Sequence, residues 1–288
     1  IFRDRYHTAR FTDWGENALF SRKTVDEIAE TEEARQIFYV QYLLHKQLKQ
    51  AAEHARKLGI SIMGDMPIGV SRDSAEVWSS PSLFNIDSST GTMPDSINRN
   101  GQNWGFPTYN WEAMEKDNYR WWQERLQHSQ QYFSAMRIDH VLGFFRIWEI
   151  PDGNVDGLKG HFSPSMPLTE NEIGYYGLTF HRDVYTRPII NDRIIDRIFG
   201  IHANYVREQY LNHKAYDLYD LKPECDTQKK ICQLFGGRND ESSLWIRDGL
   251  CRLAANVLFV TDSKDATHYH PRVNAFNTTA YQLLSPED

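Results

Sequence analysis

Three segments of the chain carry residues whose types and spacing could do chemistry, and the shortest is Arg137-Ile138-Asp139-His140. It ends a short apolar stretch that predicts a β-strand, in which Arg137 and Asp139 share one face because side chains alternate. A guanidinium beside a carboxylate favours the ionised form of that carboxylate. A fixed, ionised carboxylate is what a retaining glycosidase or transglycosylase uses as its nucleophile. The alternative is a structural Arg–Asp pair that closes the end of a strand.

A second segment, from Gly64 to Trp78, places acidic residues just beyond another predicted strand. Asp73 would then stand near the carboxyl end of that strand, where barrel enzymes carry their catalytic groups. The alternative is turn chemistry, because Asp73 and Ser74 are both residue types that cap helices.

A third segment, from Gly101 to Trp111, combines glycine and proline with aromatic residues that could wall a cleft. Trp104 stands among polar residues and glycine and is the better cleft candidate, whereas Trp111 is expected to pack against the helix that follows. Tyr109 could do either. The whole chain has 8 Trp and 15 Tyr, an excess typical of clefts in which flat rings stack on sugars.

The first half of the chain predicts alternating elements that would position these segments. Apolar residues at helical spacing predict a helix over 31–58, which Gly59 ends, followed by a buried strand over 60–68. A long loop over 70–110, a helix over 111–133 and a strand over 134–139 complete the pattern. Helix, strand, loop, helix, strand is the order of an α/β barrel or a doubly wound sheet.

The second half of the chain shows no such alternation. Helices are expected over 189–210, 227–235 and 243–260. We therefore predict part of a catalytic barrel over 1–149 and a mostly helical insertion or subdomain over 150–288. Taken alone, the second part could equally be a helical interaction module.

Composition and charge exclude several classes of protein. The 288 residues hold 32 Lys and Arg against 39 Asp and Glu, a net charge of −7, which disfavours nucleic acid or an anionic membrane as partner. No apolar run approaches the roughly 20 residues that span a bilayer. Cys225, Cys232 and Cys251 form no C-x-x-C pair and are expected to be free thiols in a reducing, cytoplasmic compartment. A zinc site that uses them with His202 or His213 would lack metal-ligand spacing, so we expect no metal.

The ends of the chain are expected to be those of a fragment. Residue 1 is Ile, and the first methionine is Met63. At the other end, Ser285-Pro286-Glu287-Asp288 has the pattern of a helix start, with a capping hydroxyl, a proline and two acids.

Together the three segments resemble the amylomaltase and disproportionating-enzyme family of 4-α-glucanotransferases, glycoside hydrolase family 77. That family carries G-D-x-P-I-x-V-x-x-D-S-A-x-V-W, W-G-x-P-x-Y-x-W and R-I-D-H in the order found here, and Trp121-Trp122 lies between the last two. The resemblance covers about 6–151 with the whole family. Residues 162–168, 224–231 and 269–272 resemble the long insertion of its plant cytosolic-type branch.

The resemblance implies a (β/α)8 barrel, here a part around its third and fourth strands, and a retaining double displacement on an α-1,4-glucan. Asp139 matches the nucleophile, and Arg137 matches the residue that orients and ionises it. Asp73 matches an acid of the donor subsite, and Trp104 an aromatic residue of the acceptor side. His140 follows the nucleophile and is grouped with the substrate-binding residues, although it could equally be a satisfied histidine at a strand end.

One part of the family pattern is missing from this chain. We find neither the G-E-D-L-G-like segment that carries the general acid/base glutamate nor the third carboxylate that follows it. Without that acid the leaving oxygen is not protonated, so we expect the chain alone to be inactive and the full-length protein to be the enzyme. The expected partners are maltose, malto-oligosaccharides and an α-glucan such as glycogen, with no cofactor. An α-glucan hydrolase and a non-catalytic glucan-binding relic are the competing functions.

Overall fold

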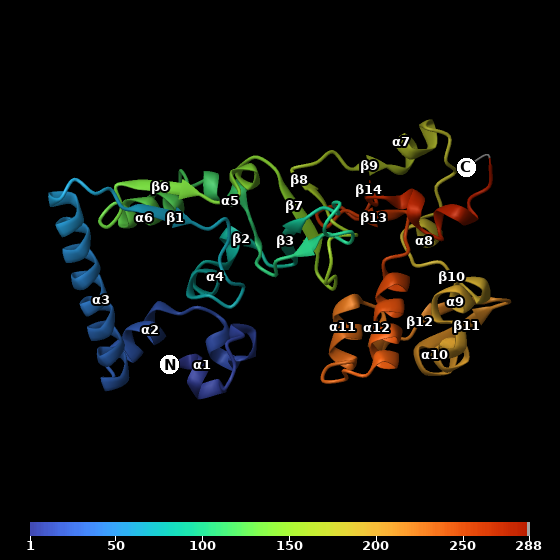
Figure 1. Ribbon diagram of the computed structural model, residues 1–288, viewed down its shortest axis with the longest axis horizontal. Coiled ribbons are helices and arrows are strands. Elements are labelled where there is room, and N and C mark those ends of the chain that lie inside the picture. The colour runs from blue at the N-terminus through green and yellow to red at the C-terminus, as the bar shows by residue number, and fades with distance from the viewer. Residues whose placement is uncertain (287–288) are drawn as a thin grey trace. The chain divides into compact units, whose positions relative to one another are not determined.

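The computed structural model describes residues 1–286, and the chain divides into two compact units (Figure 1). The first unit comprises Ile1–Asp87 and Gly105–Phe145, and the second comprises Ser88–Trp104 and Arg146–Asp288. Residues 88–104 therefore belong with the later part of the chain. Glu287 and Asp288, which complete the expected helix start, lie outside the described residues.

The first unit combines helices with short strands that associate in pairs. Its helices are α1 (Phe2–Tyr6), α2 (Arg22–Ala29), α3 (Glu32–Lys57), α4 (Ala75–Ser79), α5 (Trp111–Glu115) and α6 (Arg120–Ser129). Strand β1 (Met63–Met66) pairs in parallel with β6 (Ala135–Ile138), and β2 (Phe84–Asn85) pairs antiparallel with β5 (Thr108–Tyr109). The parallel pair confirms the expected strand–helix–strand order.

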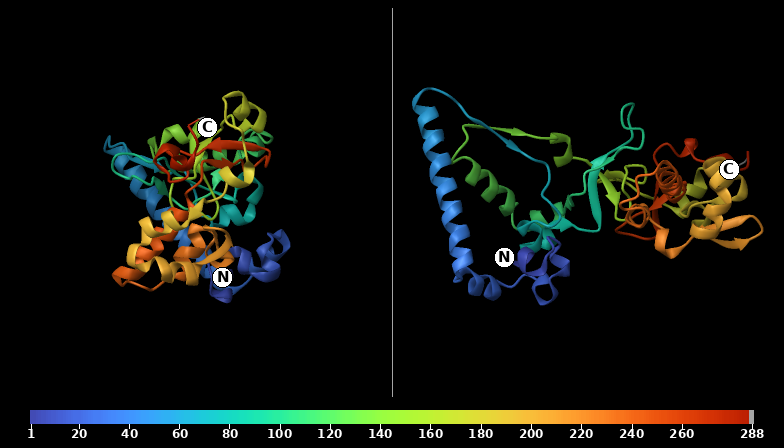
Figure 2. Two further views of the ribbon diagram at one scale, coloured as in Figure 1. Left: turned by 90° about the vertical axis from the view of Figure 1, so that its right-hand side faces the viewer. Right: turned by 60° about the horizontal axis from the view of Figure 1, so that its bottom comes forward.

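Helix α3 confirms the helix predicted over 31–58, and Figure 2 shows it as one uninterrupted rod. The side-chain oxygen of Thr31 accepts a hydrogen bond from the backbone N–H of Ala34 at 3.3 Å, which satisfies a donor of the first turn. Gly59 follows the helix at φ 71°, a left-handed conformation that glycine adopts without steric cost. The helix therefore begins and ends where its caps require.

Three expectations for the first unit are wrong in detail. The helix expected over 111–133 is divided into α5 and α6, because Asn118 and Tyr119 adopt positive φ values of 57° and 59° between them. The loop expected over 70–110 contains α4 and several short strands. Strand β1 is only half-buried, with Met63 63% exposed, since within the described residues it pairs with β6 alone.

An aromatic core stabilises the first unit. Trp111 and Trp122 stack with ring centroids 6.3 Å apart, and the Tyr109 ring lies 5.1 Å from Trp111 and 5.2 Å from Trp122. Offset and edge contacts of this kind add to the stabilisation that burial itself provides. The expectation that Trp111 packs against the following helix is confirmed, and Tyr109, for which both roles were open, packs there as well.

The second unit contains three small sheets among its described residues. The first has the strand order β4-β3-β7-β8, the second β10-β12-β11 and the third β13-β14-β9. Their bounds are β3 (Ser88–Thr92), β4 (Gln102–Asn103), β7 (Ile147–Pro151), β8 (His161–Ser163), β9 (Leu168–Thr169), β10 (Ile190–Asn191), β11 (Leu211–Ala215), β12 (Leu218–Leu221), β13 (Phe259–Thr261) and β14 (His268–Pro271). Strand β3 pairs with β7, which explains why 88–104 belongs to this unit.

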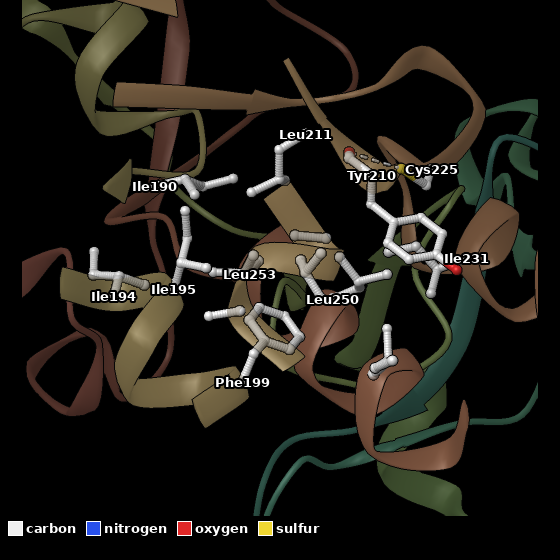
Figure 3. Close-up of a cluster of buried hydrophobic side chains, with 14 of the residues drawn as sticks. Ile190, Ile194, Ile195, Phe199, Tyr210, Leu211, Cys225, Ile231, Leu250 and Leu253 are labelled. Carbon is white, nitrogen blue, oxygen red and sulfur yellow. Dashed lines mark hydrogen bonds between the residues drawn. The ribbon is translucent and has the colours of Figure 1, made fainter. Parts of the chain in front are cut away.

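Helices of the second unit enclose a hydrophobic core. They are α7 (Glu170–Tyr175), α8 (Arg182–Tyr185), α9 (Asp192–Phe199), α10 (Ala203–Tyr210), α11 (Gln228–Leu234) and α12 (Glu241–Ala254). Figure 3 shows Ile195, Phe199, Leu250 and Leu253 converging on that core, each at most 1% exposed. Burying a side chain of this size stabilises the folded state by roughly 1.5–3 kcal/mol.

The expectation of a mostly helical second half omitted these sheets. The helix predicted over 189–210 is in fact β10, α9 and α10, and Gly200 at φ 52° separates the two helices. The helices predicted over 227–235 and 243–260 correspond to α11 and α12, although α12 ends at Ala254. In the described part of the chain, no helix combines the length and the apolar character needed to cross a membrane.

Candidate active site

The parallel pair β1–β6 forms the frame of the candidate site. Asp65 lies opposite Arg137 in its register, and Met66 lies opposite Ile138. The backbone N–H of Asp139 donates to the carbonyl oxygen of Met66 at 3.0 Å, so the pairing extends one residue beyond β6. Because the two strands are parallel, their carboxyl ends meet at one edge, where α/β enzymes of barrel type place catalytic groups.

Arg137 binds Asp65 through both arms of its guanidinium. Its Nε donates to Oδ1 of Asp65 at 3.1 Å, and its Nη2 donates to Oδ2. These hydrogen bonds raise the pKa of Arg137 above its ordinary value. The sequence predicts that Arg137 pairs with Asp139, which is wrong: two positions along one strand separate Cα atoms by about 6.6 Å, whereas Asp65 stands directly across. Asp139 acts on Arg137 only as a nearby charge.

Asp139 itself is exposed at the end of β6, with its backbone held by Met66. The next residue, His140, adopts φ 47° and ψ 53°, a left-handed conformation that is uncommon for residues other than glycine. It begins the 3-10 turn Val141–Phe144, and its carbonyl oxygen accepts from the N–H of Gly143 at 2.9 Å. The chain therefore turns away immediately after Asp139 and leaves this carboxylate at the strand end.

Asp73 lies in the turn that leads from β1 to α4, and its side chain is exposed. The cap of α4 is Ser74, whose Oγ accepts from the N–H of Val77 at 3.3 Å. Ser74 is therefore the residue that caps α4, and the capping alternative does not account for Asp73. Among the described residues, no hydrogen bond or ion pair joins Asp73 to Asp139.

Trp104 belongs to the second unit, whereas Asp139, Arg137, Asp73 and His140 belong to the first. Its backbone N–H donates to the carbonyl oxygen of Thr90 at 2.9 Å, and its indole Nε1 donates to Oε1 of Gln102, also at 2.9 Å. These contacts hold a half-buried ring whose indole N–H is satisfied. A ring held in this way could offer its face to a sugar.

Asp65 is the residue of this site that sequence reasoning missed. The sequence shows it only as an acid near the end of a strand, one residue before Met66. Its partnership with Arg137 depends on pairing across 72 positions of the chain, so the only available signal was that both predicted strands end in a charged residue.

The arrangement in the first unit supplies two functions that acyl or glycosyl transfer needs. Asp139 offers an exposed carboxylate on a backbone held by Met66, and the Asp65–Arg137 pair places a cation near it. A carboxylate of this kind can act as a nucleophile at an anomeric carbon. In the described residues, the cluster of side chains suited to a metal lies in the second unit instead, at His161, Asp262 and His270.

Comparison with known proteins agrees with this chemistry. Residues 1–234 match the family model described as 4-alpha-glucanotransferase. The chain is 40% identical over 295 aligned positions to the 4-alpha-glucanotransferase DPE2 of Oryza sativa subsp. japonica, covering 99% of this chain and 31% of that protein. It is 38% identical over 146 positions to the 4-alpha-glucanotransferase of Aquifex aeolicus, covering 48% of this chain and 30% of that protein.

A solved structure is similar as well. The amylomaltase from Streptococcus agalactiae, determined in complex with acarbose, superposes with a TM-score of 0.50 at 30% identity, covering 57% of this chain and 35% of that one. The chain thus spans about a third of the length of these relatives. The likeness indicates an α/β fold of the barrel type, and the resemblance noted in the sequence is confirmed. The chain belongs to glycoside hydrolase family 77, the 4-alpha-glucanotransferase family.

Proposed function

We propose that the protein transfers glucosyl or glucanyl units from maltose or malto-oligosaccharides to an α-glucan acceptor, with retention of configuration. The observation that carries this proposal is the exposed carboxylate of Asp139 at the carboxyl end of β6, beside the Asp65–Arg137 pair. Membership of the 4-alpha-glucanotransferase family supports the same reaction.

In the first step of the proposed reaction, a carboxylate oxygen of Asp139 attacks the anomeric carbon of the donor. A covalent glycosyl-enzyme forms as the bond to the leaving glucan oxygen breaks, and that oxygen takes up a proton. In the second step the hydroxyl of an acceptor sugar attacks the same carbon from the opposite side and gives up its proton to a base, which replaces the proton taken up by the leaving oxygen, and Asp139 leaves. Two inversions at one carbon give net retention.

We propose supporting roles for the other candidate residues. Arg137, anchored by Asp65, holds a positive charge near Asp139 and orients that carboxylate before attack. Asp73 binds hydroxyls of the donor sugar, and the ring of Trp104 stacks on the acceptor. His140 fixes the turn that exposes Asp139, and its ring would contact the substrate beside it.

The proton donor is the role that no residue of this site fills. Asp65 is the carboxyl group nearest in the register, and both of its oxygens are engaged by Arg137. With both oxygens occupied in this way, Asp65 is not placed to protonate the leaving oxygen. We therefore expect the 288-residue chain on its own to lack transfer activity, and we assign the activity to the protein expressed from its full coding sequence.

The finer fold assignment is also a proposal. We infer that β1 and β6 are the third and fourth strands of a (β/α)8 barrel, with 1–149 as part of that barrel and 150–288 as an insertion or subdomain. The parallel register of β1 and β6 and the likeness to the amylomaltase support it. We further propose a cytoplasmic location, which the free thiols of Cys225, Cys232 and Cys251 support.

Product analysis tests the proposed reaction. The protein from the full coding sequence is incubated with maltotriose, and chain lengths and reducing ends are followed by chromatography and a reducing-sugar assay. A transferase yields longer and shorter oligosaccharides at a constant number of reducing ends. A rise in reducing ends would identify a hydrolase instead, and binding of glucan without any product would identify a non-catalytic binding protein.

A further inference from the structure

The second unit brings together two histidines and an aspartate that the proposed reaction does not use. His161 begins β8, His270 lies in β14, and Asp262 directly follows β13. One potential donor atom from each residue lies within 4.8 Å of the others. The cluster is buried, since the His161 residue is 8% exposed and the side chains of His270 and Asp262 are 6% and 10% exposed.

His161 points to a missing partner. Its Nδ1 lies 3.2 Å from the carbonyl oxygen of Phe162, which can only accept, so Nδ1 carries the hydrogen. With the hydrogen on Nδ1, Nε2 carries a lone pair, and no residue in the described part of the chain makes a hydrogen bond to this buried atom. Leaving such an atom unsatisfied costs free energy. A histidine that binds a metal through one ring nitrogen usually donates the N–H of its other ring nitrogen to a backbone carbonyl or a carboxylate. His161 has this arrangement.

Asp262 is oriented for the same purpose. Its Oδ1 accepts from the backbone N–H groups of Lys264 at 2.8 Å and Asp265 at 2.9 Å. The turn that follows β13 therefore fixes this carboxylate and leaves Oδ2, which lies 2.7 Å from Nε2 of His270. Partners of this type hold metal ligands in place in known sites.

The two histidines belong to different sheets of the second unit. The rings of His161 and His270 stack with centroids 3.8 Å apart and planes inclined by 10°. His161 lies in the sheet of β7 and β8, and His270 lies in the sheet of β13 and β14. A ligand held by both would join the two sheets.

We propose that His161, Asp262 and His270 form a binding site for a divalent transition-metal ion of the zinc class. The ligands are Nε2 of His161, Oδ2 of Asp262 and Nε2 of His270, whose proton moves to Nδ1 when the ion binds. The two histidines also line a cavity with Arg146, Trp148 and Met166, from which a water molecule can reach a fourth position.

The donor set selects the class of ion. Two imidazole nitrogens and one carboxylate suit Zn²⁺, Co²⁺ or Ni²⁺, whereas Mg²⁺ and Ca²⁺ prefer oxygen ligands throughout. Bonds of about 2.1 Å to a tetrahedral ion place the donors roughly 3.4 Å apart. The His270–Asp262 contact must therefore open slightly and the wider separations must close. The two stacked imidazole rings must also turn out of their parallel arrangement so that both nitrogens point at one ion. The ion stabilises the second unit and takes no part in glucan transfer.

Metal binding to the 288-residue chain tests this proposal without any activity assay. After treatment with a chelator and dialysis, the chain is titrated with Zn²⁺ by calorimetry and with Co²⁺ by visible absorption, and its Tm is measured with and without Zn²⁺. We expect one ion per chain, the intense absorption of tetrahedral Co²⁺ and a higher Tm with Zn²⁺. A chain that binds no ion at micromolar concentrations would overturn the proposal.

Matched variants locate the ion. His161→Gln and His270→Gln should each weaken binding by more than about 100-fold, beyond the loss from removing an outer partner. Asp262→Asn keeps the oxygen that accepts from Lys264 and Asp265, so this variant should fold. It should nevertheless bind the metal ion more weakly than the parent. His213→Gln, which changes an exposed histidine outside the cluster, should bind as the parent does. Unchanged metal binding in all three cluster variants would contradict the assignment. Loss of metal binding in Cys251→Ser but in none of the cluster variants would place the ion elsewhere and also contradict it.

Discussion

Asp65 and Arg137 stand directly opposite each other in the parallel β1–β6 pair, and the guanidinium donates to both oxygens of the carboxylate. The positive charge near Asp139 is therefore anchored from the neighbouring strand rather than by Asp139 itself. This leaves the Asp139 carboxylate exposed at the strand end, where the proposed nucleophile must be accessible.

Asp65→Asn should lower kcat of the full-length enzyme with a smaller change in KM. The substitution keeps the shape of the side chain but removes the charge that holds Arg137, so the guanidinium near Asp139 becomes mobile. Because both side chains are more than half exposed, the midpoint of urea unfolding should barely move. Steady-state kinetics and urea titration provide the two measurements.

Glu124→Gln is the matched control for Asp65→Asn. It removes a carboxylate from another exposed pair, in which Arg120 Nε lies 2.8 Å from Oε1 of Glu124 on α6. This variant should keep the parental kcat. An equal loss of kcat in the two variants would show that Asp65 has no special relation to the reaction.

Trp104→Ala should weaken the use of acceptor sugars more than the cleavage of donors. The ring is held by Gln102 and the backbone of Thr90 and is proposed to stack on the acceptor, so its loss removes binding energy from that side only. The measurement compares KM for the acceptor with the rate of donor cleavage. Trp245→Ala, which removes another partly exposed indole of the second unit, is the control. Equal losses on both sides would remove the acceptor role of Trp104.

Leu250→Ala should destabilise the second unit by about 2–5 kcal/mol, because it leaves a cavity in a packed core. Leu250 is 0% exposed and lies among the side chains of Figure 3. Leu234→Ala, at a position that is 38% exposed, should cost much less. Urea unfolding of both variants gives the comparison, and similar midpoints for the two would contradict the position of this core.

Cys225 should resist alkylation in the folded chain. Burial raises the pKa of its thiol to about 11, so the reactive thiolate is scarce at pH 8 and becomes abundant only as the pH nears 11. Iodoacetamide labelling followed by peptide mass spectrometry should modify the less buried Cys232 first and Cys225 only after unfolding. Labelling of Cys225 at the rate of Cys232 would show that the thiol is accessible.

Local signals in the sequence predicted the elements that local interactions determine. The caps Thr31 and Gly59 delimit α3, and the apolar run before Arg137 predicted β6. The break between α5 and α6 had a weaker signal, Asn118, a residue type that tolerates positive φ. These features depend on residues within a few positions of one another.

Pairing between distant segments could not be predicted in the same way. Strand β3 pairs with β7 some sixty positions later, and both lie within a unit whose strands are two to five residues long. Such strands are too short to show alternation. The same reason hid the Asp65–Arg137 pair and the proximity of His161 to His270, since nothing near these residues in sequence indicates their partners.

Asp139→Asn in the full-length protein tests the proposed nucleophile most directly. The change preserves volume and the backbone hydrogen bond to Met66 but removes the charge that attacks the anomeric carbon. We predict that transfer from maltotriose falls to background while the circular dichroism spectrum and the unfolding midpoint stay those of the parent. Substantial transfer by a folded Asp139→Asn variant would show that another group is the nucleophile.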